Sequence, residues 1–174
     1  MKKFELTIKS ITNEAGKKLF RIKALIDFGD VKAGELGGYV EKEENISQDG
    51  NAWVSGNARV YGDAMVCGNA RVSGNARVCG DARVSGNAWV YDDARVYGDA
   101  DYALVQGFGT EFRCTTFYRG KNKKIMVNCG CFHGDLEAFR KQVKETRSGK
   151  IAKEYLMIAD LMEYHFTSED SSDE

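Results

Sequence analysis

The chain has 174 residues and a formal net charge of −1 at pH 7, with 43% apolar and 29% charged residues. A chain of this length can bury a packed core, and its balanced charge excludes a global electrostatic attraction to nucleic acid or to a membrane surface. No apolar run approaches the roughly 20 residues that a membrane-spanning helix needs, and the N-terminal sequence MKKFELTIKS lacks the apolar segment of a signal peptide.

Two short strands are expected in the N-terminal segment, residues 1–33. Apolar and polar residues alternate over Phe4–Ile8 and again over Leu19–Ile26. Between them, Asn13–Gly16 has the composition of a turn. We expect a hairpin that covers the first coil of the repeat that follows, because the open end of a repeat array needs a cap.

The middle of the chain repeats every six residues. From Asp49 it divides into the blocks DGNAWV, SGNARV, YGDAMV, CGNARV, SGNARV, CGDARV, SGNAWV and YDDARV, followed by a divergent ninth, YGDADY. Valine closes eight successive blocks, alanine holds the fourth place of all nine, and glycine holds the second place of all but one. A period of six does not fit the 3.6 residues of a helical turn, and glycine with Asn or Asp in every block would destabilise a helix.

Short strands joined by regular corners satisfy this period. Within a block the valine points inward and its neighbours outward, because side chains alternate along a strand. The glycine and the Asn or Asp that follows form the corner, since these residues tolerate positive φ. Stacked blocks then place valine on valine in a continuous apolar ladder. The absence of proline fits such an array, in which most strand N–H groups are needed for hydrogen bonds.

The repeat resembles the hexapeptide repeats of left-handed parallel β-helix proteins, in which an aliphatic residue is followed four positions later by a small one. Val54 and Ala58 match that pattern, as do their successors. The resemblance covers residues 34–106 and implies triangular coils of three blocks each, so that nine blocks make three coils. Gly37–Val40 and Asn45–Ile46 are expected to begin a further, irregular coil. A β solenoid of different cross-section is the alternative.

A separate module is expected over residues 107–166. The runs Thr115–Tyr118 and Lys124–Asn128 predict a short hairpin. Asp135 is a candidate N-cap for a helix that follows it, and a second helix is expected over Ile151–His165. The residues expected to face inward from the second helix are Tyr155, Leu156, Ile158, Ala159, Leu161 and Met162.

These elements together predict a mainly β protein. Its centre is a left-handed parallel β-helix, preceded by an N-terminal β-hairpin cap and followed by a small C-terminal α/β or helical module. The acidic end of the chain, residues 167–174, is expected to be disordered.

Two stretches of the chain resemble small solenoid proteins encoded by phages and prophages. They are FRIKALIDFGDVKAGELGGYVE before the repeat, and CGCFHGDLEAFRKQVKET with AKEYLMIADLMEYHF after it. This resemblance implies a protein of the host-cell cytoplasm that binds and blocks a host protein, such as a defence nuclease complex. The alternatives are a structural or assembly protein of the phage particle and a hexapeptide-repeat acyltransferase.

The sequence gives little support to catalysis or to metal binding. Many hexapeptide-repeat proteins are acyltransferases with a histidine near a coil edge, but His133 and His165 both lie outside the repeat. Cys129, Cys131 and His133, with Cys114, could offer zinc three thiolates and an imidazole. Their spacing differs from that of the usual zinc knuckle, and buried cysteines at a strand end explain them equally well. We therefore expect no enzymatic activity and no cofactor.

The chain has five cysteines, an odd number, and no export signal is recognised. Reduced thiols in a cytoplasmic protein are the natural interpretation. Cys67 and Cys79 would fall on different faces of a triangular coil, so no disulfide is expected between them.

The residue before each valine points outward, and its type differs between the three expected faces. The predicted interaction residues are Trp53, Arg71, Trp89 and Tyr91 on the first face, and Arg59, Arg77, Arg95, Tyr61 and Tyr97 on the second. The third face carries Met65, Arg83 and Asp101. Exposed Trp, Tyr and Arg are the residue types that anchor protein interfaces.

Other roles for the arginines stay open. Their stems could cover the sheet while their guanidiniums pair with the nearby aspartates Asp63, Asp81, Asp93 or Asp99. With tyrosines they could also hold phosphate. However, residues 49–102 contain five arginines, no lysine and seven aspartates, a net charge of −2, which makes a poor surface for direct contact with DNA. The sequence therefore favours a rigid platform for a host or phage protein, without membrane contact, that associates as a dimer or trimer.

Overall fold

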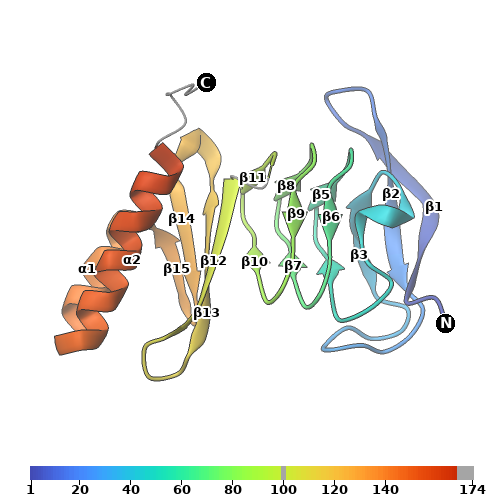
Figure 1. Cartoon of the computed structure of the whole chain (residues 1–174). Helices are drawn as coiled ribbons and strands as arrows, with labels where there is room; N and C mark the ends of the chain where they lie inside the picture. The colour runs from blue at the N-terminus through green and yellow to red at the C-terminus, as the bar shows by residue number, and fades with distance from the viewer. Residues whose placement is uncertain (99–100, 168–174) are drawn as a thin grey trace. The chain divides into compact units, whose positions relative to one another are not determined.

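A computed structural model of the chain describes residues 1–98 and 101–167. The chain separates into two compact units, Met1–Asp99 and Ala100–Glu174. The first unit is a β solenoid with an N-terminal hairpin, and the second is a four-stranded sheet with two helices (Figure 1). The protein is therefore mainly β, as predicted, while the left hand of the coil stays a prediction.

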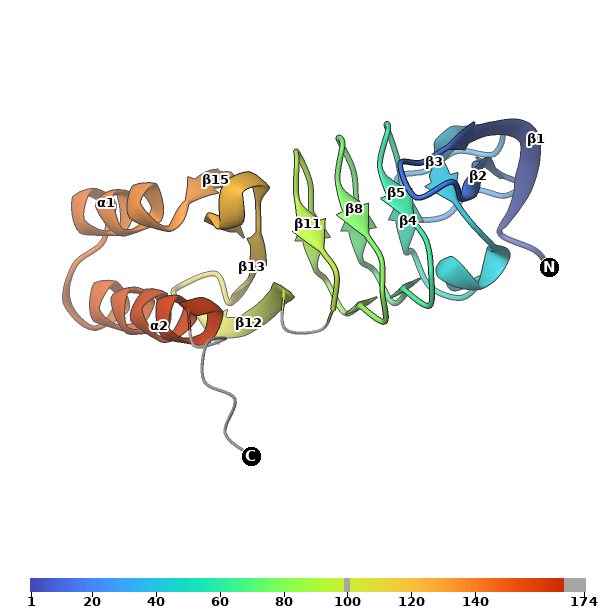
Figure 2. The same cartoon turned by 90° about the horizontal axis from the view of Figure 1, so that it is seen from above.

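The strands of the first unit form three sheets. In chain order they are β1 (Phe4–Thr12), β2 (Lys18–Ala24), β3 (Leu36–Val40), β4 (Trp53–Val54), β5 (Arg59–Val60), β6 (Met65–Val66), β7 (Arg71–Val72), β8 (Arg77–Val78), β9 (Arg83–Val84), β10 (Trp89–Val90) and β11 (Arg95–Val96). The sheet orders are β1-β2-β3-β5-β8-β11, β10-β7-β4 and β6-β9. The coils lie side by side, so that β5, β8 and β11 follow one another along the solenoid (Figure 2).

Each valine of the repeat stacks on the valine three blocks further along. Val54 pairs in parallel register with Val72, and all eight closing valines have no exposed surface. Backbone N–H groups donate from one coil to the next, as Arg59 does to the carbonyl oxygen of Ala76 at 2.9 Å. The buried valine ladder is therefore confirmed. The lack of proline is also explained, because a proline nitrogen carries no hydrogen and would remove a hydrogen bond between coils.

The corners of the solenoid adopt the left-handed backbone conformation. From Gly50 to Gly86 the second residue of each block has a φ between +63° and +71°. Asp92, which replaces glycine in the eighth block, has the same conformation with a φ of +58°. Aspartate is one of the few residues with a side chain that enter this region, which explains how the corner persists there.

The N-terminal hairpin extends one solenoid sheet and covers the end of the coil. β1 pairs antiparallel with β2, and β2 pairs antiparallel with β3, which begins the parallel array. The side chains of Phe4, Leu19 and Ile22 are fully buried. Ile8 is fully exposed, because the register of β1 against β2 shifts between Leu6 and Ser10. The predicted cap is thus confirmed, with a bulge that the alternating pattern did not indicate.

The segment before the repeat forms the further coil that the sequence predicted. Tyr39 lies opposite Arg59 in parallel register, and Ile46 bridges to Val66. A short 3-10 helix, η1 (Glu43–Asn45), lies between these two contacts.

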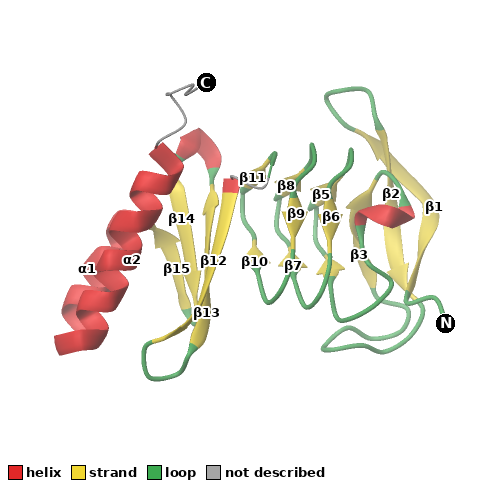
Figure 3. Cartoon of the chain, viewed as in Figure 1, coloured by secondary structure: helices red, strands yellow, loops and turns green. Residues whose placement is uncertain are grey.

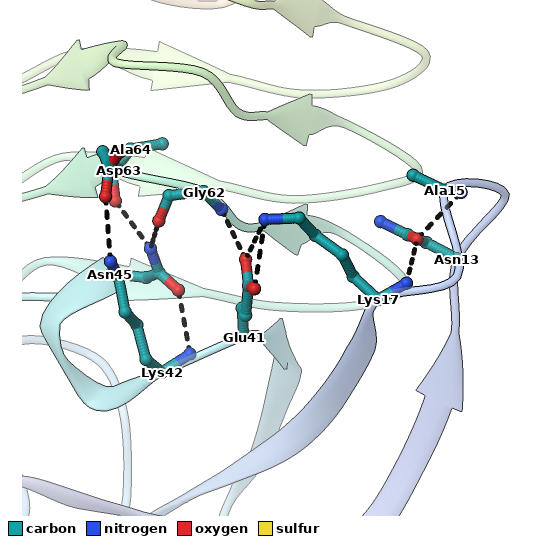
Figure 4. A network of polar contacts seen from close by, with 9 residues as sticks. All are labelled: Asn13, Ala15, Lys17, Glu41, Lys42, Asn45, Gly62, Asp63 and Ala64. Carbon is teal, nitrogen blue, oxygen red and sulfur yellow. Dashed lines mark hydrogen bonds and ion pairs between the residues drawn. The ribbon is translucent and has the colours of Figure 1, made fainter.

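A buried asparagine anchors this irregular coil (Figure 4). Asn45 has no exposed surface. Its Nδ2 donates to the carbonyl oxygens of Gly62 at 3.1 Å and Ala64 at 2.8 Å, and its Oδ1 accepts from the N–H of Lys42 at 3.0 Å. Beside it, the Glu41 carboxylate accepts from the N–H of Gly62 at 2.7 Å, which holds the pKa of that carboxyl below its usual range. Side chains of the irregular coil thus replace bonds that a regular block makes through its backbone.

Lys3 is a second buried polar group in the cap, with 2% of its surface exposed. Its ammonium donates to the carbonyl oxygens of Ala52 at 3.0 Å and Gly50 at 3.3 Å, and lies 4.9 Å from the centre of the Phe28 ring. Burial lowers the pKa of Lys3 from 10.5 to about 8.

This lowered pKa predicts a stability that depends on pH. Between the folded pKa of about 8 and the unfolded value of 10.5, the unfolded chain binds more protons than the folded one, so stability rises with pH. We expect the free energy of unfolding of the wild type, measured relative to that of a Lys3→Met variant, to rise by about 2 kcal/mol across this window. Urea unfolding of both proteins at each end of the window measures it. If the difference in free energy of unfolding between the two proteins stayed constant with pH, the lowered pKa of Lys3 would be contradicted.

The second unit packs two helices against one face of its antiparallel sheet (Figure 3). Its elements are β12 (Tyr102–Phe108), β13 (Arg113–Arg119), the 3-10 helix η3 (Lys121–Lys123), β14 (Ile125–Cys129), β15 (Phe132–Asp135), α1 (Leu136–Thr146) and α2 (Gly149–Thr167). The strands follow the order β12-β13-β14-β15. The buried core between sheet and helices consists of Phe117, Val127, Leu136, Phe139, Val143, Tyr155, Ile158, Ala159, Met162 and Phe166.

The predicted hairpin and both helices are confirmed in this unit. The Asp135 carboxylate accepts from the N–H of Ala138 at 2.9 Å and so caps α1. The prediction for Leu161 was wrong, because 58% of its surface is exposed. The buried stripe of α2 runs from Tyr155 through Met162 to Phe166 at helical spacing, and Leu161 lies one residue off it.

The boundary of the solenoid also differs from the prediction. We placed it at residue 106, but the first unit ends at Asp99 and β12 already belongs to the C-terminal sheet. The ninth block lacks the closing valine, and its last residue, Tyr102, pairs antiparallel with Tyr118. The predicted acidic tail lies outside the described residues from 168 onward, and Thr167 is the last residue of α2.

Candidate protein-binding groove

The parallel register confirms how the outward residues divide among the three faces. Arg71 lies between Trp53 and Trp89 in one sheet, since each pairs with it directly. In the second sheet Arg77 lies in the same way between Arg59 and Arg95. The period of the repeat therefore predicted correctly which side chains are neighbours across coils.

Trp53 is not exposed, which corrects its place on the predicted interaction face. Only 2% of its surface reaches solvent. The rings of Phe4 and Phe28, both from the N-terminal segment, pack edge-on against it with centroids 6.3 Å and 5.4 Å away. Trp53 therefore joins the cap to the solenoid, while Trp89, two coils further along, keeps 51% of its surface exposed.

The arginine face is engaged by the turn of the N-terminal hairpin. The carboxylate of Glu14 lies 2.8 Å from a guanidinium nitrogen of Arg77 and 3.7 Å from one of Arg59. From the sequence, aspartates of the repeat were possible partners of these arginines. The arginines are paired, but with Glu14 of the N-terminal segment. Asp99, one of those aspartates, lies outside the described residues. Two of the three stacked arginines are therefore held by the protein itself.

The tyrosines beside this face differ in exposure. Tyr97 has 47% of its surface exposed, whereas Tyr61 is half-buried. Burial raises the pKa of Tyr61 above its usual range, and the neighbouring Cys79 adds to the rise. Tyr61 thus remains a neutral phenol at ordinary pH.

A groove of about 460 Å³ lies on the tryptophan face. Its lining consists of Gly29, Asp30, Asn51, Ser55, Asn69, Arg71, Ser73, Asn87, Trp89 and Tyr91. The loop between β2 and β3 supplies the first two of these residues, and outward positions of successive coils supply the rest. Gly29 allows this loop to approach, because a Cβ there would lie 3.0 Å from a guanidinium nitrogen of Arg71.

The groove joins one cation to a row of amides. Arg71 pairs with Asp30 across it, and burial lowers the pKa of the guanidinium without neutralising it. Asn51 donates to Asn69 at 3.1 Å, and Asn69 donates to Asn87 at 3.0 Å. These amides form a ladder that fixes their orientation and leaves further donors and acceptors directed outward.

This arrangement suits a protein surface as ligand. A half-exposed Trp89 offers a large rigid contact area, and Tyr91 lies on the same face. Arg71 and the amide ladder can donate to carbonyl or carboxylate oxygens at the edge of such a contact. Arg71, Trp89 and Tyr91 thus come together as predicted.

The sequence did not predict the contribution of Asp30 or of the asparagine ladder. A signal for the ladder existed, because the third place of a block is asparagine in every third block from Asn51 onward, whereas the second series mixes Asn with Asp and the third has only Asp. Asp30 lies outside the repeat, and nothing in its local sequence indicates a contact with Arg71.

The Cys and His residues considered as metal ligands are divided between two faces of the C-terminal sheet. Cys129 lies on the face that packs against the helices, with Phe132 opposite it in register. His133 is next to Phe132 on β15 and so points to the opposite face, where its Nε2 lies 3.0 Å from the Tyr118 hydroxyl. Cys131 is exposed in the connecting turn.

Cys114 is likewise on the other face from Cys129, since Thr115 pairs with Cys129 in register. Among the described residues, no three His, Cys, Asp or Glu side chains are grouped to hold a metal ion. All five cysteines are free thiols. Neither helix in the described part of the chain has the length and hydropathy needed to cross a membrane.

The comparisons with known proteins concern the solenoid. The family model described as the YdcK beta solenoid repeat matches three overlapping segments, residues 52–68, 64–80 and 76–92. They coincide with the coils that carry β4 to β10, in a solenoid of about three turns. No curated protein matches the chain. Residues 52–92, which supply most of the lining of the groove, are thus similar in sequence to the YdcK beta solenoid repeat.

Proposed function

We propose that this chain is a non-enzymatic scaffold that binds another protein through the groove on its tryptophan face. The observation that carries the proposal is Trp89, a tryptophan with half its surface exposed at the edge of a 460 Å³ groove beside Arg71. Exposing a large aromatic ring to water is unfavourable, and tryptophan with arginine is the usual centre of a protein interface. The stacked coils hold these residues rigidly, so little order must be gained on binding.

The resemblance of the flanking stretches to phage and prophage solenoid proteins supports a more specific version. In it the partner is a host protein, such as a defence nuclease complex in the cytoplasm, and binding blocks its function by covering a surface. A structural or assembly role in a phage particle uses the same groove for a different partner.

Affinity capture with the full chain, followed by mass spectrometry, distinguishes these versions. We expect a host protein to be enriched from infected cells, and the chain to be absent from purified particles. Stoichiometric amounts in the particles would instead favour the assembly role, and enrichment of background proteins alone would contradict a binding function.

The arginine face provides a comparison within the same protein. Because Glu14 already engages Arg59 and Arg77, we expect the triple change of Arg59, Arg77 and Arg95 to serine to alter partner capture by less than about twofold. A loss of capture, in a variant whose unfolding midpoint is unchanged, would move the binding surface from the groove to the arginine face.

Two further properties belong to the proposal. We expect no thermal shift with acyl-CoA, and a clear shift would restore the acyltransferase alternative.

Self-association as a dimer or trimer also stays a prediction, which light scattering measures. Because Phe139 and Tyr155 are buried in the core of the C-terminal unit, a self-association surface on α1 or α2 would consist of other residues of these helices.

A further inference from the structure

The C-terminal unit contains a cavity of about 220 Å³ that the scaffold function does not use. It opens where the β12–β13 loop, the β14–β15 turn, the end of α1 and the middle of α2 meet. Its polar lining includes Glu111, Arg113, Gln142, Arg147 and Tyr155. We propose that this cavity binds a small organic anion, a phosphate or carboxylate carried on an apolar group.

The floor of the cavity is apolar and aromatic. Phe132 and Phe139 pack with ring centroids 5.5 Å apart, and Tyr155 packs edge-on against Phe139 at 5.9 Å. Val143 completes this side. These side chains offer a planar or aliphatic group a contact that excludes water, which favours burial of apolar surface.

Two guanidiniums at the cavity supply the positive charge. Among residues 1–98 and 101–167, no carboxylate lies within ion-pair distance of the guanidinium of Arg113 or Arg147. The Arg147 guanidinium donates only to the Thr146 carbonyl oxygen, at 3.3 Å, in this described part of the chain. Arg140, on the same helix as the cavity wall, shows the contrast, since it contacts the carboxylates of Asp160 at 2.8 Å and Glu163 at 2.7 Å. The two cavity arginines therefore keep donors that match an anion.

The backbone around these groups is shaped to hold them. A Cβ at Gly130 would lie 2.6 Å from Nη1 of Arg113, so a side chain at this position would displace the guanidinium from the β14–β15 turn. The Tyr155 hydroxyl donates to the carbonyl oxygen of Phe108 at 3.2 Å, which fixes the β12–β13 loop over α2. Burial raises the pKa of Tyr155, the neighbouring Cys129 adds to the rise, and the charges of Arg147 and Arg113 oppose it.

The charges of the side chains that line the cavity determine whether each substitution strengthens or weakens anion binding. Glu111 is the carboxylate in the lining, and its charge opposes an incoming anion. Glu111→Gln is therefore expected to tighten binding, while Arg113→Gln combined with Arg147→Gln removes both cationic donors. Lys144→Gln removes the same kind of charge from an exposed position of α1 outside the lining and serves as control.

The test is a titration of the full chain, labelled with ¹⁵N, with phenyl phosphate followed by NMR. We expect saturable shifts of amides in the cavity lining, such as those of Cys131 and Thr146, and much weaker effects of phenol and of inorganic phosphate. The double arginine variant should weaken binding by at least about tenfold, whereas Lys144→Gln should change it by less than about twofold.

Several results would overturn this site. They are the absence of saturable shifts in the cavity, binding of phenol as tight as that of phenyl phosphate, or equal weakening by Lys144→Gln. The map of shifts on the wild-type protein decides the location even if the double variant does not fold. The same titration with sodium benzoate tells whether the cavity binds a carboxylate as well as a phosphate.

Discussion

Replacing Asn45 with alanine is expected to lower the free energy of unfolding by about 3 kcal/mol. The side chain is fully buried and satisfies two carbonyl oxygens, of Gly62 and Ala64, and one N–H, of Lys42. Alanine leaves all three without a partner in a site that water does not reach. A buried polar group that loses its partner costs about 1–3 kcal/mol, so the combined loss is large.

Asn69→Ala is the matched control for this prediction. Asn69 also bonds to two neighbours, Asn51 and Asn87, but it is exposed at a corner of the solenoid. Water replaces its lost bonds, so we expect a change below about 1 kcal/mol. Urea unfolding of the two variants measures both values, and equal losses would show that Asn45 does not anchor the first coil.

Replacing Gly50 with alanine is expected to lower the free energy of unfolding by about 3 kcal/mol. Gly50 has a φ of +69°, and a Cβ there would lie 2.6 Å from the carbonyl oxygen of Gly68 in the next coil. The same oxygen accepts a bond from the N–H of Asn51 at 2.9 Å. The methyl group therefore strains the corner and separates two coils at a bond that holds them together.

Gly34→Ala separates these two effects. Gly34 has a φ of +89°, and no atom lies within 4 Å of the position of its Cβ. We expect a loss of about 1 kcal/mol from backbone strain alone. Hydrogen exchange of the Asn51 amide should accelerate strongly in Gly50→Ala and little in Gly34→Ala. If both variants lost the same stability, crowding between coils would not be the reason for glycine at this corner.

The repeat made the solenoid predictable from the sequence, because every block has its apolar, small and corner residues at the same positions. Each closing valine must be buried and each corner must accept positive φ, so the spacing alone assigned Trp89 and Arg71 to one face. The unit boundary was harder to predict, since the decayed ninth block has the alternation of an ordinary strand. Tyr102 accordingly pairs with Tyr118 in the C-terminal sheet.

The contents of the groove were only partly predictable. Exposure depends on what covers a face, and Trp53 has the same block position as Trp89 but lies under Phe4 and Phe28. Contacts between distant segments, such as that of Asp30 with Arg71, leave no periodic signal in the sequence. Local pattern therefore gave the neighbours within the solenoid, while the N-terminal segment decided which of them stay accessible.

The measurement that tests the proposed binding surface most directly compares two exposed aromatic residues of the same solenoid. Trp89 lines the groove and Tyr97 lies beside the arginine face, with 51% and 47% of their surfaces exposed. Quantitative mass spectrometry of partner capture should show at least a tenfold loss for Trp89→Ala, in the range of an interface hot spot, and less than about a twofold change for Tyr97→Ala. Full capture by Trp89→Ala, or a greater loss for Tyr97→Ala, would contradict binding through the groove.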